Sequence, residues 1–202
     1  MDDALVRDAT DAYSLGLWCA DGYWWSSSIG LSNTEPELIV RFGRYLLKDF
    51  SRDRLRLRIY KRPEDIPDPR VLALTDRVSV RPPFKMKRIA YHVYVNSRPL
   101  VRRFFRERSR LAQIDKRFVG AYIAGRFDGD GTFGVTPRIV YRSEPEAEVD
   151  SFLLTSTGIT GNSVLFYKKA NEYCIYIHKA FQEAFGHLMV PFSWKADRRF
   201  TL

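Results

Sequence analysis

A repeat at a fixed spacing constrains the fold of this chain more than any other feature. Seven residues of one segment recur, with the same identity, 109 positions later and on one gapless register. The pairs are Tyr13/Tyr122, Gly16/Gly125, Asp21/Asp130 and Gly22/Gly131, together with Glu35-Pro36-Glu37 and Glu144-Pro145-Glu146. Such self-similarity indicates a duplicated unit.

A second match locates the repeats along the chain. The segment at 91–95, YHVYV, resembles YCIYI at 173–177, but at an offset of 82 rather than 109. The first copy therefore holds about 27 additional residues, and we place them in the proline-containing stretch 62–84, with a short helix at 70–76. We predict two repeats, residues 1–112 and 113–202.

Each repeat has the pattern of a mixed α+β unit. Apolar and small residues at helical spacing predict helices over 8–19 and 116–127, followed by extended segments at 23–33 and 132–142. Further helices are expected at 38–49, 147–155, 99–111 and 179–188, and the sheets should be mostly antiparallel. The predicted N-caps are Thr10 or Asp11 and Asp115, and Gly22 and Gly131 suit a left-handed residue that closes a helix.

Small residues lie four apart on both duplicated helices, Gly16 with Ala20 and Gly125 with Gly129. Two helices that lack bulk on one stripe can pack backbone to backbone. We expect this packing to bring Asp21 and Asp130 together across a pseudo-twofold axis. Two carboxylates at the negative ends of helix dipoles require a cation, and a hard divalent ion such as Mg²⁺ suits oxygen ligands.

The charge of the chain favours a polyanionic partner. The formal net charge is +9 and the isoelectric point is near 9.7. Between 54 and 62, the arginines and a tyrosine occupy even positions, and the apolar residues Leu55, Leu57 and Ile59 occupy odd ones, which predicts a strand with one cationic face. Such a strand would present its arginines about every 6–7 Å, close to the spacing of phosphates along a nucleic-acid strand. The alternative is an ordinary solvated sheet face.

Composition excludes several classes of protein. With 45% hydrophobic and 14% aromatic residues, the chain can bury its own core, which argues against disorder or a disulfide scaffold. No apolar run is long enough to span a membrane, and the acidic N-terminal segment does not resemble a secretion signal, so we expect a cytoplasmic protein. Cys19 and Cys174 lack paired-motif spacing and are expected to be free thiols.

Residues 123–131 read IAGRFDGDG, which closely resembles the LAGLIDADG motif, and residues 15–22, LGLWCADG, resemble a degenerate copy. The chain is thus similar to single-chain, two-motif LAGLIDADG homing endonucleases, of the intron-encoded, archaeal-like kind. The resemblance implies two pseudo-symmetric αββαββα repeats, motif helices at a central interface, and two antiparallel sheets forming a DNA-binding saddle. Two departures stand out: Cys19 replaces the inner acid retained as Asp128, and Arg126 stands where an aliphatic residue is usual.

The resemblance also implies site residues. The last acid of each motif would bind Mg²⁺ or Mn²⁺, with a carbonyl from the preceding residue, which gives Asp21, Asp130, Ala20 and Gly129. A polar residue near the end of the first long strand and a lysine late in the repeat would lie near the scissile phosphates. In this sequence, Asn33 and Arg142 match the polar position, and Lys195 matches the lysine of the second repeat. For the lysine of the first repeat, Lys116 and Arg110 are both candidates.

We therefore predict a site-specific, divalent-metal-dependent endonuclease of double-stranded DNA. It would act as a monomer on a long asymmetric site and cut both strands across the minor groove to leave short 3′ overhangs. The DNA-binding candidates are Arg54, Arg56, Arg58, Tyr60, Arg62, Arg88, His92, Arg138, Lys168 and Lys169. The alternatives are an RNA maturase that assists intron splicing and a non-catalytic DNA-binding protein on the same scaffold.

Overall fold

The structure is a computed structural model, and it describes residues 5–83 and 87–196. The chain divides into two compact units. The continuous unit is Asp21–Phe105, and the split unit combines Met1–Ala20 with Arg106–Leu202. This division differs from the predicted repeats because the first motif helix is grouped with the second repeat. The predicted boundary at residue 112 describes where a repeated sequence unit ends, whereas the two units are defined by their internal contacts. The repeat boundary therefore stays a prediction.

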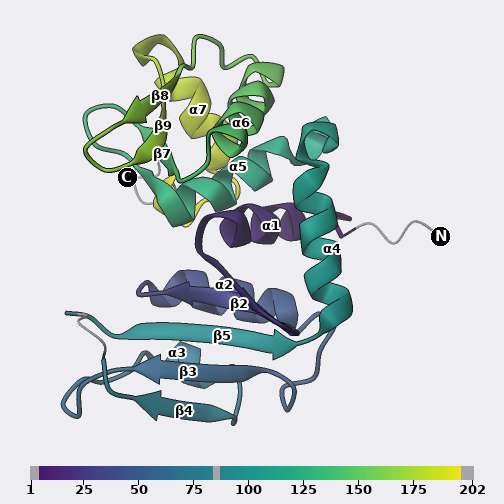
Figure 1. The fold of residues 1–202 in the computed structure, drawn as a ribbon, viewed down its shortest axis with the longest axis vertical. Helices are drawn as coiled ribbons and strands as arrows, with labels where there is room; N and C mark the ends of the chain where they lie inside the picture. Colours follow the sequence, from purple (N-terminus) through teal and green to yellow (C-terminus); the bar gives the residue numbers. More distant parts are fainter. Residues whose placement is uncertain (1–4, 84–86, 197–202) are drawn as a thin grey trace. The chain divides into compact units, whose positions relative to one another are not determined.

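The continuous unit is a five-stranded sheet covered on one face by helices (Figure 1). The strand order is β1-β2-β5-β3-β4, and every pair is antiparallel except β3 with β4. Helix α2 packs on β2 and β5, and α3 packs on α2. The elements are β1 (Gly22–Trp25), β2 (Ser28–Asn33), α2 (Pro36–Leu46), β3 (Arg56–Tyr60), α3 (Pro69–Leu72), β4 (Val78–Arg81) and β5 (Ala90–Asn96), followed by α4 (Arg98–Ser109).

The predicted alternation is confirmed for β3, whereas Arg54 and Arg62 lie outside this strand. Leu55, Leu57 and Ile59 are almost completely buried, whereas Arg56 between them is exposed. An apolar side chain that faces α2 leaves its neighbour on the opposite face, because successive side chains of a strand point to opposite sides. Strand β3 therefore separates the core of the continuous unit from a polar surface.

The split unit contains a four-stranded antiparallel sheet of order β6-β7-β9-β8. Helix α6 packs on β7, β8 and β9, and α5 packs on β7, α6 and α7. Its elements are α1 (Ala9–Asp21, of which Asp21 already belongs to the continuous unit), η1 (Leu111–Gln113), α5 (Lys116–Asp130), β6 (Gly131–Thr132), β7 (Arg138–Tyr141), α6 (Glu144–Ser156), β8 (Val164–Tyr167), β9 (Glu172–Tyr176), η2 (Lys179–Phe181) and α7 (Gln182–Met189). Both units thus confirm the predicted α+β class with mostly antiparallel sheets. The predicted DNA-binding saddle depends on how the two sheets are placed relative to each other, so it stays a prediction.

Helices α1 and α5 approach each other through glycine, as the small-residue stripes predict (Figure 1). A Cβ atom on Gly16 would lie 2.0 Å from the carbonyl oxygen of Tyr122, and one on Gly125 would lie 2.0 Å from that of Tyr13. Real side chains never approach a backbone oxygen so closely, so only glycine permits this spacing. The two contacts are related by the repeat offset, as expected of a duplicated helix pair.

The helix ends differ from the predictions. The side chain of Asp8 caps α1 by accepting a hydrogen bond from the Asp11 N–H at 2.8 Å, so neither Thr10 nor Asp11 is the N-cap. The prediction for α5 is confirmed, since Asp115 accepts a hydrogen bond from the Arg117 N–H at 2.9 Å.

The two glycines after the motif acids are not left-handed. Gly131 has φ −89° and ψ 153°, and Gly22 is the first residue of β1; among the described residues only Gly158 and Gly161 are glycines with positive φ. Each helix passes directly into a strand. Gly131 is required for another reason, because a Cβ there would lie 2.3 Å from the ring of Phe127.

The remaining boundaries shift because proline can occupy the first turn of a helix, so α2 and α6 begin earlier than predicted. In the insertion, the predicted helix at 70–76 is the shorter α3, and Phe84 lies outside the described residues. Strand β4 was not predicted. Cys19 and Cys174 are free, as expected, and no helix in the described ranges is long and apolar enough to cross a membrane.

The helix contact predicts a large effect of a single methyl group. Gly125→Ala should lower the free energy of unfolding by at least about 2 kcal/mol, because the new Cβ forces two backbones apart. The matched control is Gly134→Ala, where the nearest neighbour of a Cβ is 3.8 Å away, and its effect should stay within about 0.5 kcal/mol. Urea unfolding followed by circular dichroism measures both; equal effects would contradict the contact.

Candidate functional site

Asp130 is the last residue of α5 and is half-buried. No described residue forms a hydrogen bond or an ion pair with its carboxylate. Burial raises its pKa, and the charges of Arg126, Lys195 and Arg142 act in the opposite direction. A carboxylate without donors at the negative end of a helix dipole is a poorly stabilised anion. This position favours a bound cation.

Lys195 lies at the same helix end. Its Nζ donates hydrogen bonds to the carbonyl oxygens of Phe127 at 3.2 Å, Gly129 at 3.4 Å and Gly131 at 2.8 Å. Carbonyls in the last turn of a helix have no intrahelical partner, and a lysine there satisfies them. The structure thus brings three predicted site residues, Asp130, Gly129 and Lys195, to one place.

Asp128 has a role that the sequence analysis missed. Its carboxylate is buried and accepts four hydrogen bonds, from the hydroxyls of Tyr13 and Ser193 at 2.6 Å each and from the backbone N–H groups of Trp194 at 2.8 Å and Lys195 at 3.0 Å. It joins α5 both to α1 and to the segment that carries Lys195. The signal available in the sequence was only that this acid is retained in one motif and replaced by Cys19 in the other.

In the continuous unit, Asp21 and Asn33 are in contact. The Asn33 side-chain amide donates a hydrogen bond to the Asp21 carboxylate at 2.6 Å, and its oxygen accepts one from the Glu35 N–H at 2.7 Å. Asn33 is the last residue of β2, so the strand end holds the amide beside the motif acid. The equivalent Arg142 follows β7, is exposed, and acts on Asp130 through its charge.

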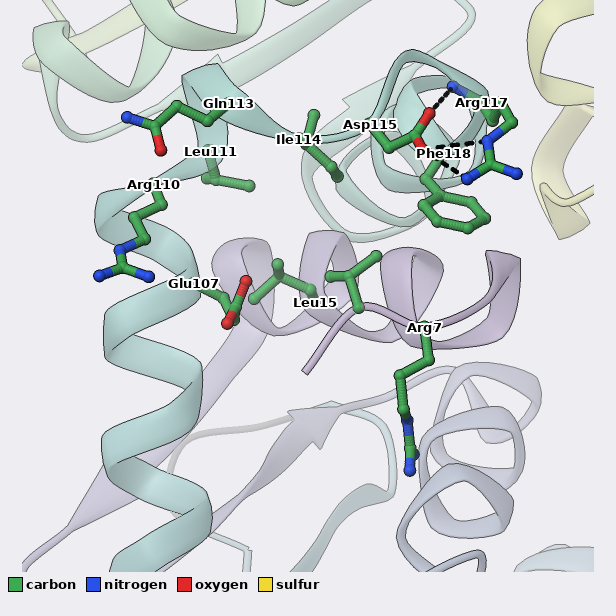
Figure 2. A pocket seen from close by; sticks show the side chains of 11 residues that line it. Arg7, Leu15, Glu107, Arg110, Leu111, Gln113, Ile114, Asp115, Arg117 and Phe118 are labelled. Carbon is green, nitrogen blue, oxygen red and sulfur yellow. Dashed lines mark hydrogen bonds and ion pairs between the residues drawn. The ribbon is translucent and has the colours of Figure 1, made fainter. Parts of the chain in front are cut away.

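The two open candidates for a first-repeat lysine lie elsewhere. Lys116 begins α5, about 20 Å along the helix from Asp130. Arg110 lines a cavity of about 420 Å³ together with Arg7, Arg117 and Phe118, as Figure 2 shows. The structure therefore places neither residue at the acidic end of α5.

Basic and aromatic side chains gather on the face of the five-stranded sheet that points away from α2. Arg58 lies 5.5 Å from the ring centroid of Tyr94 and donates to its hydroxyl at 3.3 Å. Tyr60 and Arg56 share this face of β3. Arg54 donates to the Asn96 carbonyl at 2.9 Å. We call this surface the cationic face; it consists of Arg54, Arg56, Arg58, Tyr60 and Tyr94.

One hollow on this surface contains an arginine that the sequence analysis missed. A cavity of about 230 Å³ is lined by Asp53, Arg54, Arg56, Arg77 and Asn96. Arg77 immediately precedes β4, the strand that was not predicted. Among the other predicted residues, Arg62 already pairs with Glu64 and Asp65, and Arg88 is exposed.

His92 was predicted to contact DNA, and its burial argues against a direct contact. Only 4% of its surface is exposed, because the rings of Tyr23 and Tyr94 flank it at centroid distances of 4.1 and 4.8 Å. Its Nε2 has no hydrogen-bond partner among the described residues. Burial, assisted by the charge of Arg58, lowers its pKa to about 4, so the ring is neutral at pH 7. It lies on the same face of the sheet as Arg58, its cross-strand partner, and packs between the tyrosine rings of this surface.

The sheet of the split unit carries fewer cations. Arg138, on β7, donates to the Tyr176 hydroxyl at 3.2 Å. Lys168 and Lys169 are exposed in the turn between β8 and β9. These three predicted DNA-binding residues are accessible or partly accessible, but they do not form a continuous basic row like that of β3.

The two departures from the motif pattern, Arg126 and Cys19, lie close together in the split unit. Arg126 pairs with Asp150 at 3.2 Å and lies 4.6 Å from the centroid of the Tyr141 ring. Burial opposes its charge, but Asp150 more than offsets this and raises its pKa. The same burial raises the pKa of Cys19 to about 11, so this thiol stays protonated. Arg126 is thus a core residue of the split unit, and the partly exposed Cys19 lies close to it.

No protein-family model matches the chain, and no curated protein sequence matches it. Its fold, however, is that of solved homing endonucleases. A structure of mesophilic variants of the homing endonuclease I-DmoI is similar with TM-score 0.65 at 17% identity, covering 91% of this chain and 96% of the other. I-DmoI in complex with DNA and Ca gives TM-score 0.67 at 17% identity over 94% and 96%. I-WcaI bound to its DNA recognition sequence gives 0.59 at 14% identity over 94% and 84%.

The environment of His92 predicts a pH effect on stability. The pKa of His92 is about 4 in the folded protein and 6.5 in the unfolded chain, so the unfolded chain binds the proton first as the pH falls. The free energy of unfolding should therefore decrease between pH 6.5 and pH 4. Relative to His92→Phe, which keeps a ring between Tyr23 and Tyr94, the wild type should lose about 2–3 kcal/mol over this window. Denaturant unfolding at pH 7, 5.5 and 4 measures the difference; parallel curves would contradict a neutral buried ring.

Proposed function

We propose that this protein is a site-specific, divalent-metal-dependent endonuclease of double-stranded DNA. The observation that carries the proposal is the end of α5, where Asp130 has no donor among the described residues and Lys195 lies on the adjacent carbonyls. The similarity to homing endonucleases solved with DNA supports the same conclusion. The type of cut, short 3′ overhangs formed across the minor groove, is part of the proposal.

The residues present fit a hard divalent cation. Asp21 and Asp130 offer carboxylate oxygens, and Ala20 and Gly129 offer carbonyls. No group of three or more His, Cys, Asp or Glu side chains that could hold a metal occurs in the described residues, so phosphate oxygens and water would complete the coordination. When bound, Mg²⁺ or Mn²⁺ would activate water and stabilise the charge that develops on the phosphate. I-DmoI was solved with DNA and Mn.

The chain's own side chains have separate parts in the reaction. Asn33 holds Asp21 in place through its amide, while Lys195 and Arg142 place positive charge near Asp130. A fixed ammonium group at this point stabilises the negative charge of a phosphorane-like transition state. Hydrogen bonds to carbonyls of α5 hold Lys195 before DNA arrives, which reduces the reorganisation needed during the reaction.

The cationic face is proposed to bind DNA. Arginine rows on β3 suit phosphates and guanine edges, and tyrosines provide further polar contacts. The sheets of the two units differ in charge and aromatic content, so the recognition site should be asymmetric. Because both motif helices belong to one chain, we propose that the protein acts as a monomer.

An RNA maturase or a non-catalytic DNA-binding protein would use the same scaffold without cutting. Retention of both motif acids favours cutting. The decisive experiment selects bound duplexes from a randomised double-stranded DNA library and incubates them with Mg²⁺ or Mn²⁺. Metal-dependent double-strand cuts at a fixed position support the proposal, and specific binding without cuts supports the alternatives.

The acids give the first test. Asp21→Asn and Asp130→Asn should each abolish double-strand cleavage, because each loses metal affinity, while DNA affinity stays within about tenfold. A matched control is Glu183→Gln, an exposed acid of α7, which should cut as the wild type does. Gel assays of the selected duplex measure cleavage and binding separately. Near wild-type cutting by either aspartate variant would remove that residue from the site.

The salt dependence of binding tests the cationic face. The double variant Arg56→Ala/Arg58→Ala should reduce the slope of log affinity against log salt by about 1–2, because two phosphate contacts are lost. Arg70→Ala is the control, since Arg70 already pairs with Asp68 and Glu37 beside α2. An unchanged slope in the double variant would mean that DNA binds elsewhere.

A further inference from the structure

The four hydrogen bonds of Asp128 have a consequence for the proposed reaction. Two of them come from the backbone N–H groups of Trp194 and Lys195, and a third comes from the Ser193 hydroxyl. Ser193 in turn accepts a hydrogen bond from the Ala196 N–H at 2.9 Å. One buried carboxylate therefore fixes the backbone on both sides of the Lys195 side chain.

We propose that Asp128 is a positioning residue, which sets the place of Lys195 beside Asp130 without itself touching DNA or metal. This inference rests on the proposed function of Lys195. The carboxylate is fully buried and satisfied by protein donors, so it is not available as a ligand. The lysine ammonium reaches the carbonyls of Phe127, Gly129 and Gly131 only because its backbone is tied to the same turn of α5.

Hydrogen-bond chemistry explains why a carboxylate is needed here. Backbone N–H groups only donate, so both oxygens of residue 128 must accept: Oδ2 receives the Trp194 N–H and Oδ1 receives the Lys195 N–H. An asparagine has one acceptor oxygen and one NH₂ group that only donates. In either orientation, Asp128→Asn would place its NH₂ group against a backbone N–H group. One of the two hydrogen bonds from the Trp194 and Lys195 N–H groups would therefore be lost.

Tyr13 provides a matched control within the same network. Its hydroxyl donates to Oδ2 of Asp128 at 2.6 Å from α1, whereas the two backbone hydrogen bonds to Asp128 come from Trp194 and Lys195. Tyr13→Phe therefore removes one bond of the buried carboxylate and leaves both backbone bonds in place. This variant separates the effect of losing one hydrogen bond to Asp128 from the effect of releasing the backbone at Trp194 and Lys195.

The test is a double-mutant cycle on the selected duplex with Mg²⁺. Lys195→Met should lower the cleavage rate about 100-fold, and Asp128→Asn should lower it at least about tenfold with DNA affinity unchanged within about threefold. In the Lys195→Met background, Asp128→Asn should have an effect of less than about threefold, because both changes remove the same contribution. Tyr13→Phe should stay within about threefold of the wild type.

Amide hydrogen exchange provides a readout that does not depend on activity. The Trp194 and Lys195 amides should exchange faster in Asp128→Asn and at the wild-type rate in Tyr13→Phe. If Asp128→Asn does not fold, Ser193→Ala replaces it; this variant keeps the carboxylate and should lower the rate by about three- to tenfold, again without effect in the Lys195→Met background.

The outcomes distinguish this inference from the proposed function. A wild-type chain that binds but never cuts overturns the proposed function. If the wild type cuts, then an unchanged rate in Asp128→Asn, or effects of Asp128→Asn and Lys195→Met that multiply, overturns the positioning role. Lys195→Met at the wild-type rate overturns it as well, because the anchored residue would then have no part in the reaction.

Discussion

The close approach of α1 and α5 is the constraint on which the split unit depends. Gly16 and Gly125 let each helix reach the backbone of the other, at a spacing that no side chain tolerates. Contacts around this pair then follow from the short distance between the helices: the Tyr13 hydroxyl of α1 reaches Asp128 of α5. A chain with alanine at these positions would lose both the packing and the polar contact built on it.

The end of α5 shows how one helix terminus can serve structure and chemistry together. Lys195 donates to the carbonyls of Phe127 and Gly129 in the last turn of this helix and to that of Gly131, its C-cap. The neighbouring Asp128 is fully satisfied, whereas Asp130, two residues later, has no donor in the described part of the chain. The two acids of this motif thus have opposite environments. Asp128 is suited to hold the protein backbone in place, and Asp130 is suited to bind a metal ion.

The sheets of the two units present different surfaces. In the continuous unit, β3 and the stacked Arg58–Tyr94 pair form a basic and aromatic surface, supported by the neutral ring of His92. In the split unit, basic residues are fewer, and the buried Arg126–Asp150 pair contributes to the core rather than to a surface. The same strand-and-helix architecture therefore carries two surfaces of unequal charge.

The sequence by itself determined the α+β architecture, the glycine contact between the motif helices and the alternation of β3, because these depend on local periodicity and on residue size. It also named Lys195 and Asn33 as candidates near the scissile phosphates, through resemblance to a family, and the structure places them beside Asp130 and Asp21. Only the tertiary structure decided the burial of His92, the pairing of β4 with β3, the extended conformation of Gly131 and the anchoring role of Asp128. Each of these depends on which distant residues come into contact: two tyrosine rings around His92, a partner strand for β4, the Phe127 ring beside Gly131 and the 193–196 backbone on Asp128. No pattern within a single helix or strand encodes such contacts.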